Sequence, residues 1–230
     1  RGKVVRDVSF SLRAGEILGF AGLVGAGRTE TMRLIFGADA PEGGELVVHG
    51  KSIKIRDPRE AISHGICLLT EDRKNQGLVL VHSVVENFGL PNLEKYSGKV
   101  FLDEGRERER FDKFVDDIQI KVSRADQDAG HLSGGNQQKV VLAKWLERDA
   151  DILIFDEPTR GIDIGAKFEI YQLMNSLVEA GKAIIMISSE LPEVLGMSDR
   201  IIVMRGGRIQ GEITNVTEAS QQEVMYLAVE

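Results

Sequence analysis

The segment Ile17–Thr29 reads Ile-Leu-Gly-Phe-Ala-Gly-Leu-Val-Gly-Ala-Gly-Arg-Thr. Its first five residues form a short apolar run of strand length, a glycine-rich turn follows, and a helix-length segment begins near Arg28. Glycines let the backbone wrap closely around phosphate oxygens with several N–H groups pointing inward, and the positive end of the helix adds to the attraction. The segment therefore predicts a phosphate-binding loop between a buried strand and a helix.

The glycine spacing of this loop is a weak signal by itself. The chain has 25 glycines among 230 residues, so a Gly-x-x-Gly-x-Gly pattern arises by chance roughly 0.3 times in such a chain. The loop also departs from the usual pattern, because Arg28 stands where lysine is expected. The Thr29 hydroxyl is a candidate ligand of Mg²⁺. The predicted nucleotide-binding residues are Gly22, Gly25, Ala26, Gly27, Arg28, Thr29 and Glu30.

A second apolar run ends in two carboxylates. Asp156 and Glu157 directly follow Ile152–Phe155, and open α/β sheets place their ligands at the carboxyl ends of strands. Asp156 is therefore a candidate Mg²⁺ ligand, and Glu157 is a candidate for orienting or deprotonating an attacking water. The alternative, that both carboxylates only cap the next turn, loses weight when a phosphate loop occurs in the same chain.

Short apolar runs alternate with helix-length segments along the chain. The middle runs are almost continuous in Ile, Leu and Val, which is typical of parallel strands buried on both faces, and an alternating order indicates crossover helices. We thus expect an α/β fold with a mostly parallel sheet. The predicted strands are 4–12, 17–21, 44–50, 66–69, 152–155, 183–187 and 201–204, and the predicted helices are 28–36, 137–147 and 166–180.

A charged segment interrupts this alternation. Residues 72–129 show helical spacing of apolar side chains, and the run 103–110 alternates acidic and basic residues in the manner of a solvated helix face. We interpret the segment as a helical subdomain inserted into the α/β core. The predicted division assigns 1–71 and 134–230 to the core and 72–133 to the helical subdomain.

Composition excludes several classes of protein. With 42% hydrophobic and 28% charged residues the chain is globular, and its net charge of −7 disfavours a nucleic-acid partner. The single cysteine, Cys67, lies in an apolar run and is expected in the core of a protein from a reducing compartment. No apolar run approaches membrane-span length. Because Arg1 opens the chain without methionine, we expect a piece of a longer polypeptide.

The most specific signal is Leu132–Gln138, which reads Leu-Ser-Gly-Gly-Asn-Gln-Gln. Such a motif arises by chance in on the order of one in a thousand chains of this composition. It resembles the signature Leu-Ser-Gly-Gly-Gln of the nucleotide-binding domains of ATP-binding cassette (ABC) transporters, and the other motifs follow in the family's order. The resemblance implies a P-loop NTPase fold with N-terminal antiparallel strands, and ATP and Mg²⁺ as cofactors. It further implies that a partner cassette's nucleotide contacts Ser133, Gly134, Gly135 and Asn136.

Other positions either match the family or depart from it. Gly161, Ile162 and Asp163 stand where the family's loop contacts the partner cassette, whereas Glu71 replaces a glutamine near the metal and Ser189 replaces the switch histidine. A serine lacks the polarised N–H of histidine, and arginine does not reproduce the compact charge of lysine. Together with Arg28, these departures predict a degenerate nucleotide site in which Glu71 joins Thr29 and Asp156 near the metal.

The combination resembles the C-terminal cassette of bacterial ribose, galactose and xylose importers. The matching segments are Gly25–Glu30, Glu71–Lys74, Ser133–Lys139, Asp156–Gly161 and Ser188–Glu193. This resemblance implies a peripheral ATPase subunit at the cytoplasmic face of the inner membrane, with weak hydrolysis at its own site. It would pair with a second cassette, such as the N-terminal half of the same polypeptide, and with a permease that an external sugar-binding protein supplies.

Three alternatives to the sugar-importer ATPase stay open to different degrees. One is a nucleoside importer ATPase, and another is a nucleotide-dependent dimerisation and docking module without catalysis, for which Glu157 would have no use. A third, a cassette ATPase of DNA repair or chromosome structure, is disfavoured. The chain has no long heptad insertion and no cysteine-rich metal motif, and it carries a net negative charge.

Overall fold

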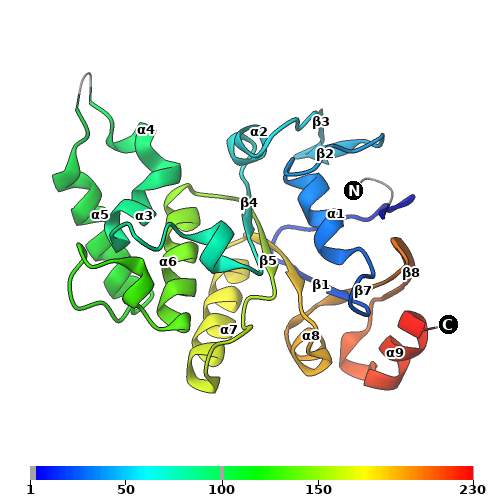
Figure 1. The fold of residues 1–230 in the computed structure, drawn as a ribbon. Helices are drawn as coiled ribbons and strands as arrows, with labels where there is room; N and C mark the ends of the chain where they lie inside the picture. The colour runs from blue at the N-terminus through cyan, green and yellow to red at the C-terminus, as the bar shows by residue number, and fades with distance from the viewer. Residues whose placement is uncertain (1–3, 99–100, 230) are drawn as a thin grey trace. The chain divides into compact units, whose positions relative to one another are not determined.

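A computed structural model describes residues 4–98 and 101–229, and the chain divides into two compact units (Figure 1). We call the first the core unit; it comprises Arg1–Leu68, Asp151–Pro158 and Met174–Glu230. The second, the helical unit, comprises Leu69–Ala150 and Thr159–Leu173. The helical unit is larger than the predicted subdomain 72–133, whose bounds as a functional subdomain stay a prediction.

The core unit is built on a six-stranded sheet in the order β4-β5-β6-β1-β7-β8. β1, β5, β6 and β7 form parallel pairs, and β8 runs antiparallel to β7. All residues of β1 and β6 are buried, as the continuous apolar runs predict. The strands are β1 Ile17–Ala21, β4 Ile66–Leu69, β5 Ile152–Asp156, β6 Ala183–Ile187, β7 Arg200–Arg205 and β8 Arg208–Ile213.

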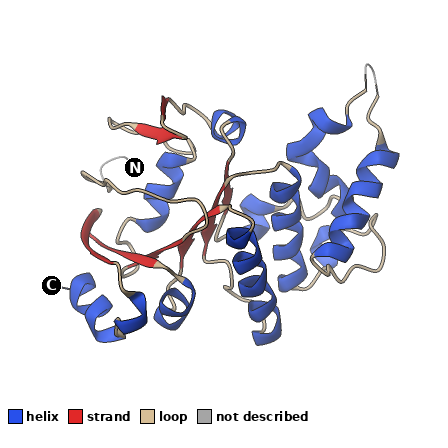
Figure 2. Cartoon of the chain, turned by 180° about the vertical axis from the view of Figure 1, so that it is seen from behind, coloured by secondary structure: helices blue, strands red, loops and turns tan. Residues whose placement is uncertain are grey.

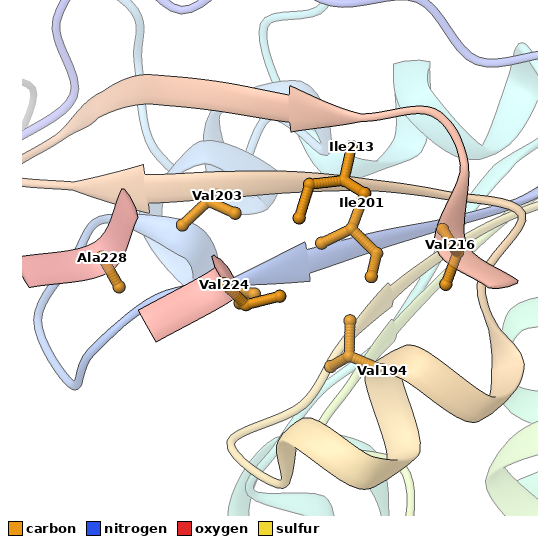
Figure 3. Close-up of a cluster of buried hydrophobic side chains, with 8 residues drawn as sticks. Val194, Ile201, Val203, Ile213, Val216, Val224 and Ala228 are labelled. Atoms are coloured by element: carbon orange, nitrogen blue, oxygen red, sulfur yellow. The ribbon is translucent and has the colours of Figure 1, made fainter. Parts of the chain in front are cut away.

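Helices cover both faces of this sheet. Figures 1 and 2 show α1, Arg28–Ile35, on one face, with α8, Leu191–Met197, and α9, Gln221–Val229, on the other. Side chains from β7, β8, α8 and α9 form a buried aliphatic cluster (Figure 3). Fully burying one such side chain contributes about 1.5–3 kcal/mol. The cluster consists of Ala21, Val194, Ile201, Val203, Ile213, Val216, Val224 and Ala228.

The predicted strand over 4–12 is wrong, whereas a small antiparallel sheet forms nearby in the sequence. Residues 4–12 form no strand, because Asp7 adopts a φ of 50°, which breaks the alternating pleat. The antiparallel pair consists of β2, Leu46–Val48, and β3, Lys51–Ile53. His49 and Gly50 join them with φ values of 50° and 74°, as a type I′ turn requires.

The helical unit confirms the predicted helical insertion. α3, α5 and α6 enclose an aromatic core in which Phe88 and Phe111 are fully buried with ring centroids 5.5 Å apart. Ser83 and Glu86 form a reciprocal capping box at the start of α3. None of the helices in the described ranges is both long enough and apolar enough to cross a membrane. The elements are α3 Val84–Gly89, α4 Leu93–Tyr96, α5 Glu104–Asp117, α6 Gly134–Glu147 and α7 Ile164–Glu179, whose last residues belong to the core unit.

A buried ion pair fastens the edge of the sheet to the preceding chain. The Arg200 guanidinium of β7 donates to the Glu16 carboxylate, to Glu212 of β8 and to the Ser11 carbonyl, and both Arg200 and Glu16 are buried. Burial by itself raises the pKa of Glu16, but hydrogen bonds from Arg200 and from the Arg13 amide hold it below its usual value. The ionised pair is therefore the folded form.

We expect Arg200→Met to lower the free energy of unfolding by about 3 kcal/mol, because Glu16 would keep a buried charge without its cation. Urea unfolding at neutral pH measures the loss. The matched control is Arg208→Met on β8, where an exposed arginine pairs with exposed Asp7. Such surface pairs contribute at most about 1 kcal/mol. Equal losses in the two variants would contradict this account.

The same pair predicts a dependence on pH. A carboxylate with a lowered folded-state pKa stabilises the fold above its unfolded pKa, and this contribution disappears as the pH falls through the folded value. The native chain should therefore lose more stability than Arg200→Met when the pH falls from about 5 to about 3. If stability fell equally with pH in the two proteins, the lowered pKa of Glu16 would not depend on Arg200.

Candidate functional site

Three strand ends meet at one edge of the core sheet. β6 lies between β1 and β5, and the parallel register pairs Ile187 with Phe20 on one side and with Asp156 on the other. The glycine loop after β1, the carboxylates at the end of β5 and the serines after β6 therefore begin at the same level. Open α/β sheets bind ligands at such carboxyl ends.

The loop between β1 and α1 depends on left-handed glycines. Gly22, Gly25 and Gly27 have φ values of 147°, 81° and 100°. A side chain at Gly22 would collide with the Met204 carbonyl, whose oxygen lies 2.3 Å from the ideal Cβ position, whereas a Cβ at Gly25 would meet no atom within 4 Å. Gly22 thus permits packing on β7, and Gly25 lies in open space where a ligand has room to approach the backbone.

Helix α1 begins at Arg28 behind the left-handed Gly27, and no side chain of the described residues caps it. Its first-turn amides therefore remain available to an anion, and the helix dipole favours negative charge at this end. Ala26 contributes to the rigidity of the loop: its amide donates to Leu23 and its carbonyl accepts from Gly207. Glu30 lies in the first turn of α1.

The Arg28 side chain turns toward the ends of β5 and β6. Its Nη1 donates to the Ser188 carbonyl over 2.7 Å, and its Nη2 lies 3.9 Å from Glu157 Oε1. The guanidinium is buried, and burial lowers the pKa of Arg28 although Glu157 and Asp156 oppose that shift. Arg28 therefore brings its positive charge to the two carboxylates and not to the open side of the loop.

Thr29 and Asp156 provide neighbouring oxygen atoms. The Thr29 hydroxyl donates to Asp156 Oδ1 over 3.2 Å, and burial raises the pKa of Asp156 to about 6. Hydroxyl and carboxylate oxygens suit Mg²⁺, which is usually held by few protein ligands together with phosphates and waters. Residues 4–98 and 101–229 contain no cluster of three or more His, Cys, Asp or Glu side chains suited to a metal.

Glu157 occupies a strained backbone position beside Ser189. Its φ of 51° is unusual for a residue other than glycine, and its amide is tied to the Ile187 carbonyl over 2.9 Å. The Ser189 hydroxyl donates to Glu157 Oε2 over 3.0 Å. The bond to Ile187 holds Glu157 at the end of the sheet, and Ser189 contacts its carboxylate directly; the switch role of Ser189 stays a prediction.

In the helical unit, the motif at 132–138 opens α6. Ser133 is the N-cap residue, and Gly134, Gly135 and Asn136 form the first turn. A Cβ at Gly134 would lie 2.6 Å from Arg73 Nη2, and one at Gly135 would lie 2.7 Å from the Ala166 Cβ. Close packing on α7 therefore requires Gly135, whereas a side chain at Gly134 would displace the end of Arg73 and crowd the Gly161 carbonyl at 3.0 Å. The amides of both glycines lie at the positive end of a 14-residue helix.

The loop at 160–163 is held by residues that follow β4. Arg73 donates to the carbonyls of Arg160 and Gly161 over 2.8 and 3.4 Å, and Glu71 forms an ion pair with Arg160. Glu71 thus has a cationic partner within its own unit, and its predicted place near a metal stays a prediction. The role of Arg73 was not predicted from the sequence, although this residue lies in the segment Glu71–Lys74.

The rest of that loop leads into α7. The Ile162 amide donates to the Thr159 carbonyl, and the Asp163 carboxylate accepts from the Ala166 amide over 3.0 Å, in the manner of an N-cap. Ser188, which anchors Arg28, was a second residue missed. Its own hydroxyl donates to Glu193 over 2.7 Å, so the start of α8 helps to place its carbonyl.

The chain is similar to a known protein family and to several proteins with assigned names. The family model described as "ABC transporter" matches residues 5–160. A putative ribose/galactose/methyl galactoside import ATP-binding protein of Burkholderia ambifaria is 53% identical over the whole chain, and a ribose import ATP-binding protein of Bacillus subtilis is 54% identical over 96% of it. A xylose import ATP-binding protein of Thermoanaerobacter pseudethanolicus is 53% identical over 98%. The chain spans 45% of the length of each of these relatives.

Solved structures share the fold. A dimeric ATP-binding cassette in a post-hydrolysis state with ADP and phosphate matches with a TM-score of 0.78 at 23% identity, over 92% of this chain and 91% of that one. This likeness confirms the expected α/β cassette fold with its mostly parallel sheet, small antiparallel sheet and helical subdomain. The family match and the sequence relatives show that the chain belongs to the ABC transporter family.

Proposed function

We propose that this chain is an ATP-binding cassette that couples ATP binding and hydrolysis to sugar import. The observation that carries the proposal is the convergence of Arg28 and Thr29, Asp156 and Glu157, and Ser188 and Ser189 at one edge of the sheet. The loop and helix start would hold the phosphates of ATP. Thr29 and Asp156 would hold Mg²⁺, which when bound draws charge from the phosphates.

Within the proposed site, the protein residues would have distinct tasks. Amides of 25–30 would bind phosphate oxygens, and Glu157 would orient or deprotonate a water. The Arg28 charge, directed at Glu157 and Ser188, supports a site that hydrolyses weakly. A carboxylate near a guanidinium is a weaker base, and the guanidinium must leave its carbonyl partner before it can contact a phosphate.

The chain would contribute to a second site through its signature. The signature residues Ser133, Gly134, Gly135 and Asn136 would form the surface that faces the nucleotide held by a partner cassette, with Gly161, Ile162 and Asp163 in the contact loop. Because the chain spans 45% of its relatives' length, we infer that it is one of two fused cassettes. The resemblance of segments such as Gly25–Glu30 and Glu71–Lys74 to second cassettes supports the C-terminal position. The fast site would combine the partner's phosphate loop with this signature.

The names of the relatives, which refer to ribose, galactose, methyl galactoside and xylose import, support a sugar substrate. We propose a monosaccharide importer whose permease this cassette contacts at the cytoplasmic face of the membrane, with an external sugar-binding protein as indirect partner. Residues 74–88 follow the Glu71 segment and would face the permease. A nucleoside importer remains the neighbouring alternative, which sugar and nucleoside uptake assays separate.

Glu157→Gln separates a catalytic cassette from a docking module. We expect this variant, in the assembled transporter, to lower steady-state ATP hydrolysis and ribose uptake more than twofold, because ATP at this site would no longer be cleared. The measurements are phosphate release and uptake of labelled sugar by vesicles. Unchanged rates of both would contradict the catalytic proposal and favour a nucleotide-dependent docking module.

Arg28→Lys tests which site turns over. Since the proposal assigns most hydrolysis to the site built with Ser133, we expect sugar uptake by the assembled transporter to change less than twofold. The matched control is Arg33→Lys on the same helix, where the arginine pairs with Asp39. Abolished uptake in Arg28→Lys, with normal uptake in the control, would contradict the assignment of most hydrolysis to the site built with Ser133.

A further inference from the structure

A chain of hydrogen bonds in the helical unit ends at the Ser133 hydroxyl. The Lys121 amide donates to Asn136 Oδ1 over 2.6 Å, and Asn136 Nδ2 donates to Ser133 Oγ over 2.9 Å. Elementary chemistry determines which atom donates and which accepts in each of these hydrogen bonds. A backbone amide can only donate, so the atom of Asn136 that faces Lys121 is the oxygen and the atom that faces Ser133 is the nitrogen.

This direction determines what the serine can do. An amide nitrogen cannot accept a hydrogen bond, so the Ser133 oxygen accepts and its proton must point elsewhere. Ser133 is the N-cap residue of α6, yet its side chain makes no capping bond. Within residues 4–98 and 101–229, its hydroxyl proton has no acceptor. An exposed serine at a helix start is thus left as a donor.

The loop that supplies the Lys121 amide is fixed by a second contact on the same face of α6. Lys139 lies one turn after Asn136; its ammonium is buried, donates to the Gln119 carbonyl over 2.9 Å and pairs with Glu169 of α7 at 2.5 Å. Gln119 itself has a φ of 52°, which turns the chain back onto α6. Asn136 therefore receives its hydrogen bond from an anchored segment.

We infer that Asn136 is a positioning residue that holds the Ser133 hydroxyl as a hydrogen-bond donor toward a phosphate oxygen of the partner cassette's nucleotide. The inference rests on the proposed function, in which Ser133 faces that nucleotide. The amide of Asn136 is polarised by Lys121, and each bond in such a chain strengthens the next. The oriented hydroxyl would join the helix dipole and the first-turn amides of α6.

A double-mutant cycle in the assembled transporter tests the inference. Ser133→Ala, Asn136→Ala and the double variant are compared by kcat and KM for ATP. One hydrogen bond corresponds to roughly a three- to tenfold change in kcat/KM. We expect each single variant to show such a loss and the double variant to lose no more than Ser133→Ala, because Asn136 acts through Ser133. Losses that multiply would overturn the inference.

Asn136→Asp tests whether Asn136 orients the Ser133 hydroxyl or only supports the segment that carries the Lys121 amide. Aspartate keeps an acceptor for the Lys121 amide, but its other oxygen would accept the serine proton and turn it inward. We expect a greater loss of kcat/KM than in Asn136→Ala, and most of this excess should vanish in a Ser133→Ala background, where only the added charge acts. An excess that persists undiminished in that background would contradict the inference, and thermal unfolding verifies that each variant is folded.

The cycle also distinguishes the inference from the proposed function. If Ser133→Ala leaves ATP kinetics unchanged, the signature does not contact a nucleotide and the proposed function fails at that point. If Ser133→Ala impairs ATP kinetics while Asn136→Ala does not, the proposed function stands and the positioning role of Asn136 is wrong.

Discussion

The pairing of β6 between β1 and β5 is the constraint on which the site depends. Parallel strands in register end at one level, so Phe20, Ile187 and Asp156 bring three connecting segments together. The backbone of each segment is then specialised: left-handed glycines after β1, a left-handed Glu157 after β5, and a carbonyl at Ser188 that accepts from Arg28. A slip in either pairing would separate the threonine from the carboxylate it contacts.

Charge is distributed unevenly around this edge. Asp156 is buried and its pKa is raised to about 6, while the nearby cation, Arg28, is itself buried and held by a carbonyl. The Arg28 guanidinium already has protein partners in the Ser188 carbonyl and Glu157. A lysine, with one compact ammonium in place of a planar guanidinium, would not contact both in the same way. An arginine held in this way is consistent with a cassette whose own site is slow and whose main contribution is the signature it offers to a partner.

Much of the fold could be predicted because its strands are continuous apolar runs. The segments 17–21, 66–69 and 183–187 are strands with those bounds, and α1 and α6 begin within three residues of their predicted starts. The strand predicted over 4–12 was wrong because alternation of residue types carries no information about the backbone of Asp7. The boundaries of the two units could not be predicted, because each unit combines segments that are distant in the sequence. The periodicity of apolar residues describes only neighbouring residues.

The sequence indicated which residues belong to the candidate site, but not which residues they hydrogen-bond. Glycine spacing and terminal carboxylates point to Thr29, Asp156 and Glu157 as residue types with known chemistry. The attachment of Arg28 to the Ser188 carbonyl, of Arg73 to Gly161 and of Asn136 to the Lys121 amide depends on chain segments 15 to 160 residues apart. Such contacts arise from tertiary structure and leave no local pattern.

We propose that this edge of the sheet binds Mg²⁺ and ATP in spite of Arg28. Calorimetric titration of Mg-ATP into the chain tests it most directly, with Thr29→Ala as the variant that removes one proposed metal ligand. The account predicts saturable binding in the micromolar range that weakens in Thr29→Ala. The absence of saturable binding up to millimolar Mg-ATP would contradict it.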